Sequence, residues 1–421
     1  MLDLRAVRED PERFRAGLAR RDAAEHFDRL LELDAEQRAL KVKVEELRAE
    51  QNRVAKSVGR ASPGERPKLV EEGKRVGADL RDVEPDLERT TGRLEELLAE
   101  LPNLPDETVP DGEGEEDNEE IRRWGDPPSF DFEPKDHMEL GESLRMIDVE
   151  RGVRTSGSRF YYLTGAAVRL HFALLQYGMD FAERHGLTPM WTPALVRREA
   201  MYGTGFLPTD EAQIYVVRED DLYLIGTSEV TLASYHASEI LDLAELPLRY
   251  LGYSTCFRRE AGTYGKDTRG IFRLHQFDKL EMFSFVSPDA SREEHDRLLS
   301  MEEEWVQSLG LSYRVVNVCI GELGASAAKK YDIEAWFPGQ NAYREITSTS
   351  NTTDYQARRL GVRVRGEGGN QPVHTLNGTL CALSRTIVCI MENHQQADGS
   401  ISVPEALHPY VPEHARVISP A

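Results

Sequence analysis

The densest group of side chains that could do chemistry lies between Phe257 and Glu281, in the sequence FRREAGTYGKDTRGIFRLHQFDKLE. Two strand-like runs flank a loop rich in Gly, Lys and Arg. Period-two geometry places Arg258 and Glu260 on one face of the first run, and it places Phe277 with Glu281 on one face of the second. An arginine fork matches phosphate oxygens, an aromatic ring stacks on a purine, and a carboxylate holds an ammonium group. The segment therefore predicts a site for a polyanion that carries a flat base and for a cationic group.

A salt-bridged ladder on the surface of two paired strands is the structural alternative for this segment. Such a ladder easily explains one of these charged residues. It explains less well why all of them occur together beside a basic loop. The GTYGK sequence at Gly262–Lys266 is not a P-loop, because the spacing is wrong and no Ser or Thr follows the lysine.

A second candidate group lies near the C-terminus. The run Leu380–Met391 is apolar on every side except for Arg385, which predicts a buried helix. A buried guanidinium needs an anion, and this could be a ligand or a structural carboxylate. Asn377 and Thr379 offer an amide and a hydroxyl just before this helix, and a simple N-cap with a Gly turn is equally compatible with them.

Thr227, Ser228 and Glu229 follow a strand-like run and open a helical pattern. From the residues alone, helix capping by these side chains is favoured over a polar substrate pocket. Farther along, Glu345 leads into the hydroxyl-rich sequence TSTSNTT. Glu345 and Ser348 could hold a divalent cation that bridges phosphates, because hard cations take oxygen ligands. A polar loop remains an equal alternative there.

The first hundred residues must form a different kind of structure. Apolar residues recur three and four apart on both sides of the breaker-rich sequence GRASPGERP, which predicts an antiparallel helical hairpin about 45 Å long. Pro85 lies inside the second helix and predicts a kink. Basic residues gather at the tip, opposed only by Glu65: Arg53, Lys56, Arg60, Arg66 and Lys68. Contact with RNA and a dimerising or spacer coiled coil both remain open.

Composition sets the outer limits. The 421 residues exceed one ordinary domain, and the net charge of −22 argues against a protein that wraps nucleic acid with its whole surface. We expect an arm at 1–105, a solvated acidic linker at 106–120 and a folded domain at 121–421, in which an antiparallel sheet packs with helices. The four cysteines have no zinc-ligand spacing, and the N-terminus has no signal-peptide core. We therefore expect reduced thiols, no zinc, no membrane span and a cytoplasmic location.

Together these segments resemble the class II aminoacyl-tRNA synthetases, and specifically the bacterial-type seryl-tRNA synthetases, over essentially the whole chain. GLTPMWTPAL is similar to motif 1, FRRE…FRLHQFDKLE to motif 2 and LNGTLCALSRT to motif 3. GTSE and KKYDIEAWFPGQNAYREITSTSN are similar to segments of the seryl branch. The resemblance implies an α+β protein, with an N-terminal antiparallel α-helical coiled-coil arm and a catalytic domain of antiparallel β-sheet flanked by helices. It also implies ATP, L-serine and tRNA(Ser) as partners (with tRNA(Sec) where present), Mg²⁺ bound with ATP, and a homodimer.

The resemblance assigns roles residue by residue. Arg258 would bind the ATP α-phosphate and the serine carboxylate, Glu260 the adenine edge, and Phe277 would stack on the ring. Arg385 would lie over the adenine and reach the γ-phosphate, so the implied catalytic set is Arg258, Glu260 and Arg385. The implied ATP and metal set is Arg258, Arg259, Glu260, Leu274, Phe277, Glu345, Ile346, Thr347, Ser348 and Arg385, with Glu345 and Ser348 holding Mg²⁺. The implied serine set is Thr227, Ser228, Glu229, Arg258, Glu281, Asn377 and Thr379, and the implied tRNA set is Arg53, Lys56 and Arg60.

The family commonly has Ser where this chain has Thr379, so the hydroxyl is kept and a methyl group is added. Three rival functions remain. An amino acid:carrier-protein ligase shares the core but lacks the long arm. A non-catalytic scaffold predicts decay of residues such as Arg258 and Arg385, which are present. A specialised paralogue that serves a biosynthetic or inhibitor-resistance role has the same motifs.

Overall fold

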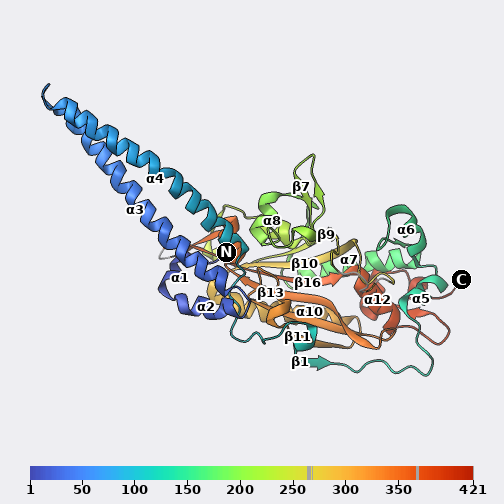
Figure 1. The fold of residues 1–421 in the computed structure, drawn as a ribbon. Coiled ribbons are helices and arrows are strands. Elements are labelled where there is room, and N and C mark those ends of the chain that lie inside the picture. Colours follow the sequence, from blue (N-terminus) through green and yellow to red (C-terminus); the bar gives the residue numbers. More distant parts are fainter. Residues whose placement is uncertain (263–266, 268, 367–368, 421) are drawn as a thin grey trace. The chain divides into compact units, whose positions relative to one another are not determined.

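The computed structural model describes residues 1–262, 267, 269–366 and 369–420 (Figure 1). Residues 263–266 of the GTYGK sequence lie outside the described residues. The chain divides into two compact units, one formed by Leu2–Leu104 and the other by Met1 with Pro105–Ala421. No helix in the described part of the chain is both long and apolar enough to cross a membrane.

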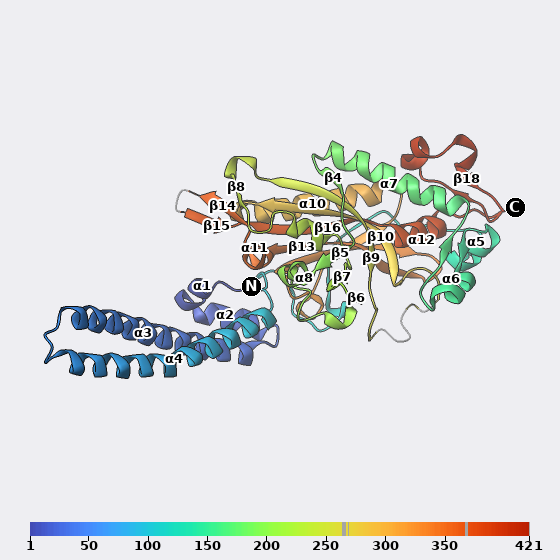
Figure 2. The same ribbon diagram turned by 90° about the horizontal axis from the view of Figure 1, so that it is seen from above.

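The N-terminal unit is a helical hairpin preceded by two short helices. Its elements are α1 (Leu4–Glu9), α2 (Pro11–Ala19), α3 (Ala24–Arg60) and α4 (Arg66–Glu100). The long helices α3 and α4 lie side by side (Figures 1 and 2), and Val44 of α3 packs with Leu80 and Val83 of α4 in a seam along the hairpin. The heptad pattern is thus confirmed. α4 continues through Pro85, which is exposed.

The second unit is built on an eight-stranded sheet with the order β1-β11-β12-β13-β16-β10-β9-β4. Every neighbouring pair is antiparallel except β4 and β9, which are parallel. The strands are β1 (Glu119–Trp124), β4 (Thr188–Trp191), β9 (Leu248–Phe257), β10 (Gln276–Val286), β11 (Tyr313–Asn317), β12 (Lys329–Phe337), β13 (Ala342–Thr353) and β16 (His374–Ala382). The predicted hairpin of two runs is therefore the β9–β10 pair.

Three helices, α7 (Ala166–Arg184), α10 (Ser291–Ser308) and α12 (Leu383–Asn393), share one apolar core with the sheet. Tyr177 and Trp305 stack within it, with ring centroids 4.7 Å apart. Side chains along β10 alternate between the two faces of the sheet. Leu280 and Met282 enter this core, whereas Phe277 and Lys279 line a cavity on the other face. The core thus fixes which side chains of β10 are available for chemistry.

Smaller elements complete the unit. The other helices are α5 (His137–Ser143), α6 (Val149–Ser156), α8 (Arg198–Thr204), α9 (Glu229–Ser234) and α11 (Tyr355–Leu360). The short strands are β2 (Ile147–Asp148) with β3 (Tyr162–Leu163), β5 (Leu195–Arg197) with β7 (Leu222–Leu224) and β6 (Val216–Val217), β8 (Ile240–Leu241) with β14 (Arg363–Gly366) and β15 (Gly369–Pro372), and β17 (Ile401–Ser402) with β18 (Val417–Ile418).

The acidic segment 106–120 is not a solvated tether as expected. Val109 is 3% exposed and packs with Val316 and Ile320 in a small apolar cluster. The Ile320 N–H donates to the Pro110 carbonyl at 3.0 Å, and β1 begins at Glu119 as an edge strand beside β11. One buried valine and these backbone bonds hold the segment on the domain, although most of its other residues are acidic and exposed.

The predicted start of the C-terminal helix was also wrong. Asn377 and Thr379 are not a helix cap; they lie inside β16, which pairs with β10 on one side and β13 on the other. The helix α12 begins only at Leu383. A run that is apolar on every side fits a buried central strand as well as a buried helix, so its periodicity could not locate the change.

Candidate active site

A cavity of about 380 Å³ opens on the sheet face that carries Phe277, Lys279 and Glu281. Its walls come from β10, β13 and β16, from the N-terminal ends of α9 and α12, from the residues after β9 and from the segment 322–327. Most of the predicted site residues line it: Thr227, Glu229, Arg258, Glu260, Leu274, Phe277, Glu281, Glu345, Ile346, Thr347, Ser348, Asn377, Thr379 and Arg385. Segments far apart in the sequence thus converge on one space.

One part of the cavity is acidic. Glu281 is 1% exposed and forms an ion pair with Lys279, and the Thr379 hydroxyl donates to Glu281 at 3.3 Å. Glu229 accepts a 2.7 Å hydrogen bond from the Gln356 amide. Burial, reinforced by the negative charge of Glu281, raises the pKa of Glu229 to about 7. Two buried carboxylates and a hydroxyl match a small molecule that has an ammonium and a hydroxyl group.

Another part of the cavity is lined by arginines. The Arg258 Nε donates to the Gly226 carbonyl at 3.2 Å, and its guanidinium lies 5.3 Å from the centroid of the Phe277 ring. This geometry leaves the outer nitrogens of Arg258 beside an aromatic face, as binding of a phosphate next to a stacked base requires.

Arg385 has several anchors. Its Nη1 donates to the Glu345 carbonyl at 2.9 Å and lies 3.4 Å from the Glu345 carboxylate. Its guanidinium lies 4.7 Å from the centroid of the Phe272 ring. Burial opposes ionisation of Glu345, but Arg385 and Lys330 outweigh it and lower the pKa of this carboxyl to about 2. The partly buried guanidinium therefore has a structural carboxylate, and it also borders the cavity, where binding of a ligand anion stays a prediction.

Glu260 reaches the cavity in a way that the period-two argument did not predict. β9 ends at Phe257, and Glu260 has a left-handed φ of 52°, a conformation that is uncommon for a residue other than glycine. The Arg273 guanidinium donates to its carboxylate at 2.7 Å. Strained backbone of this kind often accompanies a functional constraint.

The proposed metal ligands share a face because of a β-bulge. Glu345 and Ser348 are three positions apart, which in a regular strand places them on opposite faces. The pairing with β12 shifts between Ile333 and Glu334, so that Ile346 is an extra residue and the two side chains return to the same side. A carboxylate and a hydroxyl oxygen suit Mg²⁺ that arrives with phosphates. Among the described residues no group of three His, Cys, Asp or Glu side chains has metal-site geometry.

Two predicted residues lie away from the cavity lining. Ser228 is fully buried and its hydroxyl donates to the Gly252 carbonyl at 3.3 Å, so it packs α9 against β9. Arg259 is exposed, because it follows the end of β9 and alternates with its neighbours. In the hairpin unit, Lys56 and Arg60 are exposed, and Arg53 pairs with Glu50 on its own helix.

Two lysines of the cavity were missed. Lys279 lies two positions from both Phe277 and Glu281, so the same period-two argument places it on their face. Lys330 lies 3.1 Å from Asp332 on β12 and lines the cavity from that side. No local spacing connects Lys330 with the other site residues, because pairing between distant segments brings β12 beside β13.

Comparison with known proteins gives the family. Residues 1–105 match the model of the seryl-tRNA synthetase N-terminal domain, and residues 215–394 match that of the tRNA synthetase class II core domain (G, H, P, S and T). The chain is 52% identical to the serine–tRNA ligase of Streptomyces coelicolor over 415 residues, which are 98% of this chain and 97% of that protein. The chain belongs to the seryl-tRNA synthetase family. A relative from Clavibacter michiganensis with the same enzyme name is 51% identical over 98% of this chain and 96% of its own.

Solved seryl-tRNA synthetase structures agree with this assignment. The enzyme of Pyrococcus horikoshii, determined with ATP, has a TM-score of 0.95 at 40% identity and covers 100% of both chains. The cytoplasmic enzyme of Naegleria fowleri, determined with AMP, has a TM-score of 0.87 at 36% identity over 97% of this chain and 96% of that one. The predicted α+β fold and enzyme class, a class II serine–tRNA ligase, are confirmed. The match to the N-terminal arm domain also speaks against a carrier-protein ligase.

Proposed function

We propose that this seryl-tRNA synthetase makes seryl-adenylate from L-serine and ATP in the cavity described above, then passes the seryl group to the 3′ end of tRNA(Ser), and of tRNA(Sec) where that tRNA is present. The observation that carries the proposal is a single cavity that joins a pocket with two buried carboxylates to an arginine-lined end. We place the enzyme in the cytoplasm, in keeping with four buried, unbridged cysteines.

The acidic pocket holds serine. The ammonium group lies against Glu229 and the Thr227 hydroxyl, and the serine hydroxyl donates to Glu281. The hydroxyl of Thr379 already contacts Glu281, at 3.3 Å, so it belongs to the same polar surface and orients this carboxylate. A pocket built to hydrogen-bond a hydroxyl rejects alanine strongly, because alanine leaves a buried polar group unpaired.

ATP occupies the arginine-lined end. Arg258 binds the α-phosphate, Phe277 stacks on the adenine, Glu260 accepts from its edge and Arg385 reaches the γ-phosphate. Glu345 and Ser348 would hold Mg²⁺, which would supply neutralisation of phosphate charge. A serine carboxylate oxygen then attacks the α-phosphorus in line, the bond to the β-phosphate oxygen breaks, and pyrophosphate leaves. Arg258 stabilises the charge that develops on the α-phosphoryl oxygens. Catalysis otherwise depends on the positioning of serine against ATP, so no side-chain nucleophile is needed.

In the second step a ribose hydroxyl of the terminal tRNA nucleotide attacks the seryl carbonyl and AMP leaves. We assign the basic tip residues Arg53, Lys56 and Arg60 to phosphate contacts that hold the tRNA. We also propose a homodimer. It is supported by apolar side chains exposed around the motif 1 segment: Trp191 is 87% exposed and Phe172 is 59% exposed.

Serine-dependent exchange of pyrophosphate into ATP tests the first step, with threonine, alanine and glycine as competing amino acids. We expect exchange with serine far above exchange with the other three. Exchange that is equal for serine and alanine would contradict the serine pocket, and no exchange with any amino acid would contradict the adenylate reaction itself. Attachment of labelled serine to tRNA(Ser) then tests the second step.

A further inference from the structure

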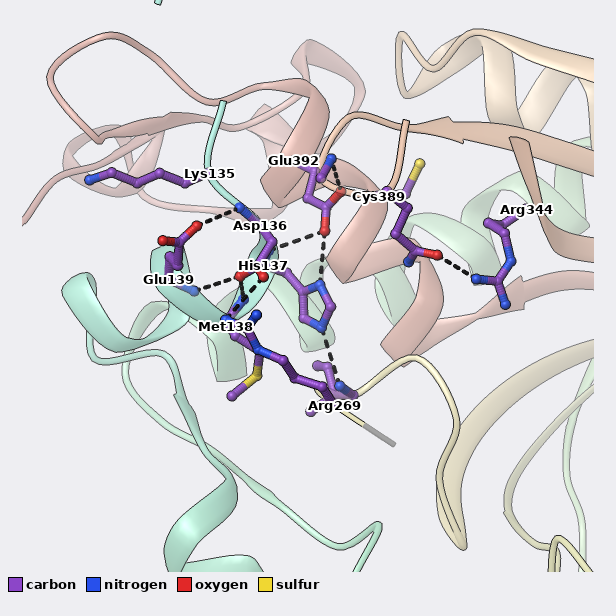
Figure 3. Close-up of polar contacts among 12 residues, drawn as sticks. Lys135, Asp136, His137, Met138, Glu139, Arg269, Arg344, Cys389 and Glu392 are labelled. Atoms are coloured by element: carbon purple, nitrogen blue, oxygen red, sulfur yellow. Dashed lines mark hydrogen bonds and ion pairs between the residues drawn. The ribbon is translucent and has the colours of Figure 1, made fainter. Parts of the chain in front are cut away.

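His137 is a buried residue at the start of α5 that joins two segments bordering the ATP end of the cavity. Its backbone N–H and its ring Nδ1 both contact one carboxylate oxygen of Glu392, at 3.1 and 2.8 Å (Figure 3). The other oxygen of Glu392 accepts from the Gly339 N–H at 2.9 Å. His137 is 6% exposed and Glu392 is fully buried. A carboxylate accepts only, so the ring proton lies on Nδ1.

The opposite ring nitrogen holds the returning end of the loop that follows β9. The Ile271 N–H donates to His137 Nε2 at 3.3 Å, which requires a neutral ring with an unprotonated Nε2. The preceding residue, Gly270, has a left-handed φ of 88°, and a Cβ there would lie 2.0 Å from His137 Nε2. Arg269 pairs with Asp136, which caps α5 (Figure 3). Backbone and ring are therefore in direct, tightly fitted contact.

These contacts lead to Arg385 by two routes. Ile271 precedes Phe272, whose ring lies under the Arg385 guanidinium and whose carbonyl accepts from Arg385 Nε at 3.5 Å. Glu392 lies on α12, seven residues after Arg385, which is about 10 Å along the helix axis. His137 thus contacts both the residue before Phe272 and a residue of the helix that bears Arg385. His137 itself is not part of the cavity lining.

We propose that His137 is a positioning residue for ATP: through Ile271 and Glu392 it sets the place of Phe272 and Arg385, and it has no part in serine binding. This inference rests on the proposed function of the cavity. It separates the two substrates, because the acidic pocket around Glu281 is held by Lys279 and Thr379 and receives no contact from His137.

Two substitutions separate the two ring contacts. In His137→Asn the amide nitrogen can take the place of Nδ1 and keep the bond to Glu392, but the Ile271 N–H loses its acceptor. In His137→Gln the longer side chain can present its oxygen to Ile271; the ring donor to Glu392 is lost, but the backbone N–H of residue 137 still donates to this carboxylate. In pyrophosphate exchange we expect the KM for ATP to rise about tenfold in His137→Asn, as for one lost buried hydrogen bond, while the KM for serine changes less than about twofold. His137→Gln should recover most of the ATP affinity.

His394→Asn is the matched control. His394 follows the same helix and donates to the Leu309 carbonyl at 2.8 Å, away from the loop, so its loss should lower the melting temperature without separating the two KM values. Gly270→Ala disturbs the contact from the loop side and should reproduce the effect of His137→Asn, and it decides the question if His137→Asn does not fold. An unchanged KM for ATP, an equal rise in both KM values, or the same separation in His394→Asn would overturn the inference. Wild-type protein without serine-dependent exchange would instead overturn the proposed function.

Discussion

In the proposed binding mode, we predict that the buried Glu229 makes serine binding depend on pH. Its side chain is 8% exposed, and burial together with the negative charge of Glu281 raises its pKa to about 7. Only the ionised carboxylate attracts the serine ammonium group strongly. We therefore expect the KM for serine to fall as the pH rises through 7, and we expect Glu229→Gln to remove this dependence.

The size of the effect follows from the pKa of Glu229. With a pKa of about 7, roughly a tenth of the carboxyl groups are ionised at about pH 6 and roughly nine tenths at about pH 8. If only the ionised form binds, the apparent KM at about pH 6 is then roughly tenfold higher than its plateau at high pH. The ammonium group of serine stays protonated over this range, so it adds no opposing trend.

The same carboxyl group makes a prediction for the free protein with a defined sign. The folded-state pKa of Glu229 is raised above its unfolded value of 4.5, so the folded state binds the extra proton. The stability that this proton contributes is complete below about pH 4.5 and is lost as the pH rises through about 7, by up to about 3 kcal/mol. Wild-type protein should therefore lose melting temperature over this range relative to Glu229→Gln.

The assay is pyrophosphate exchange at saturating ATP, with the KM for serine measured at several pH values between about 6 and 8 in one mixed buffer. Glu229→Gln should bind serine weakly, with a KM that does not change with pH. A flat wild-type profile, or a KM that rises with pH, would show that Glu229 is already ionised at the lower pH or does not meet the ammonium group.

Three further predictions address other parts of the enzyme. Arg258→Ala should slow exchange by a factor of about 10² to 10³ at saturating ATP, and near-normal exchange would remove Arg258 from the reaction centre. Reversing the charges of Arg53, Lys56 and Arg60 to Glu should leave exchange intact and raise the KM for tRNA at least about tenfold, whereas equal loss of both activities, or of neither, would contradict a tRNA-binding arm. Thr379→Ala should raise the KM for serine about tenfold while Thr379→Ser stays within about threefold of wild type, and equal effects would mean that the hydroxyl does not act.

The helical hairpin was the part of the fold most open to prediction from sequence. Its apolar spacing is periodic over dozens of residues, and the two helices end at the breakers between Arg60 and Arg66. The central strands were harder, because β16 is buried on both faces between β10 and β13 and so has no period. The prediction for the acidic segment failed for another reason: the buried Val109 and backbone hydrogen bonds to residues far along the chain hold it on the domain, and composition shows neither.

The sequence predicted which residues and segments belong to the site, but it did not predict which of these residues lie next to one another. Period two gave the face of β10 that bears Phe277 and Glu281, yet the bulge at Ile346 that joins Glu345 to Ser348 depends on pairing with β12. Pairing between distant segments is a long-range property, and local spacing does not contain it.

Glu229 shows most clearly what folding adds to the sequence. Beside its own strand it is an acid at a helix N-terminus, and capping was the favoured interpretation. In the fold it shares a pocket with Glu281, which forms an ion pair with the buried Lys279. Burial and the negative charge of Glu281 raise the pKa of Glu229 to about 7, so near neutral pH this carboxyl carries a proton in a large fraction of molecules. In the proposed binding mode a ligand ammonium group replaces that proton and pairs with the Glu229 carboxylate, so we expect an amino acid analogue without an ammonium group to bind weakly there.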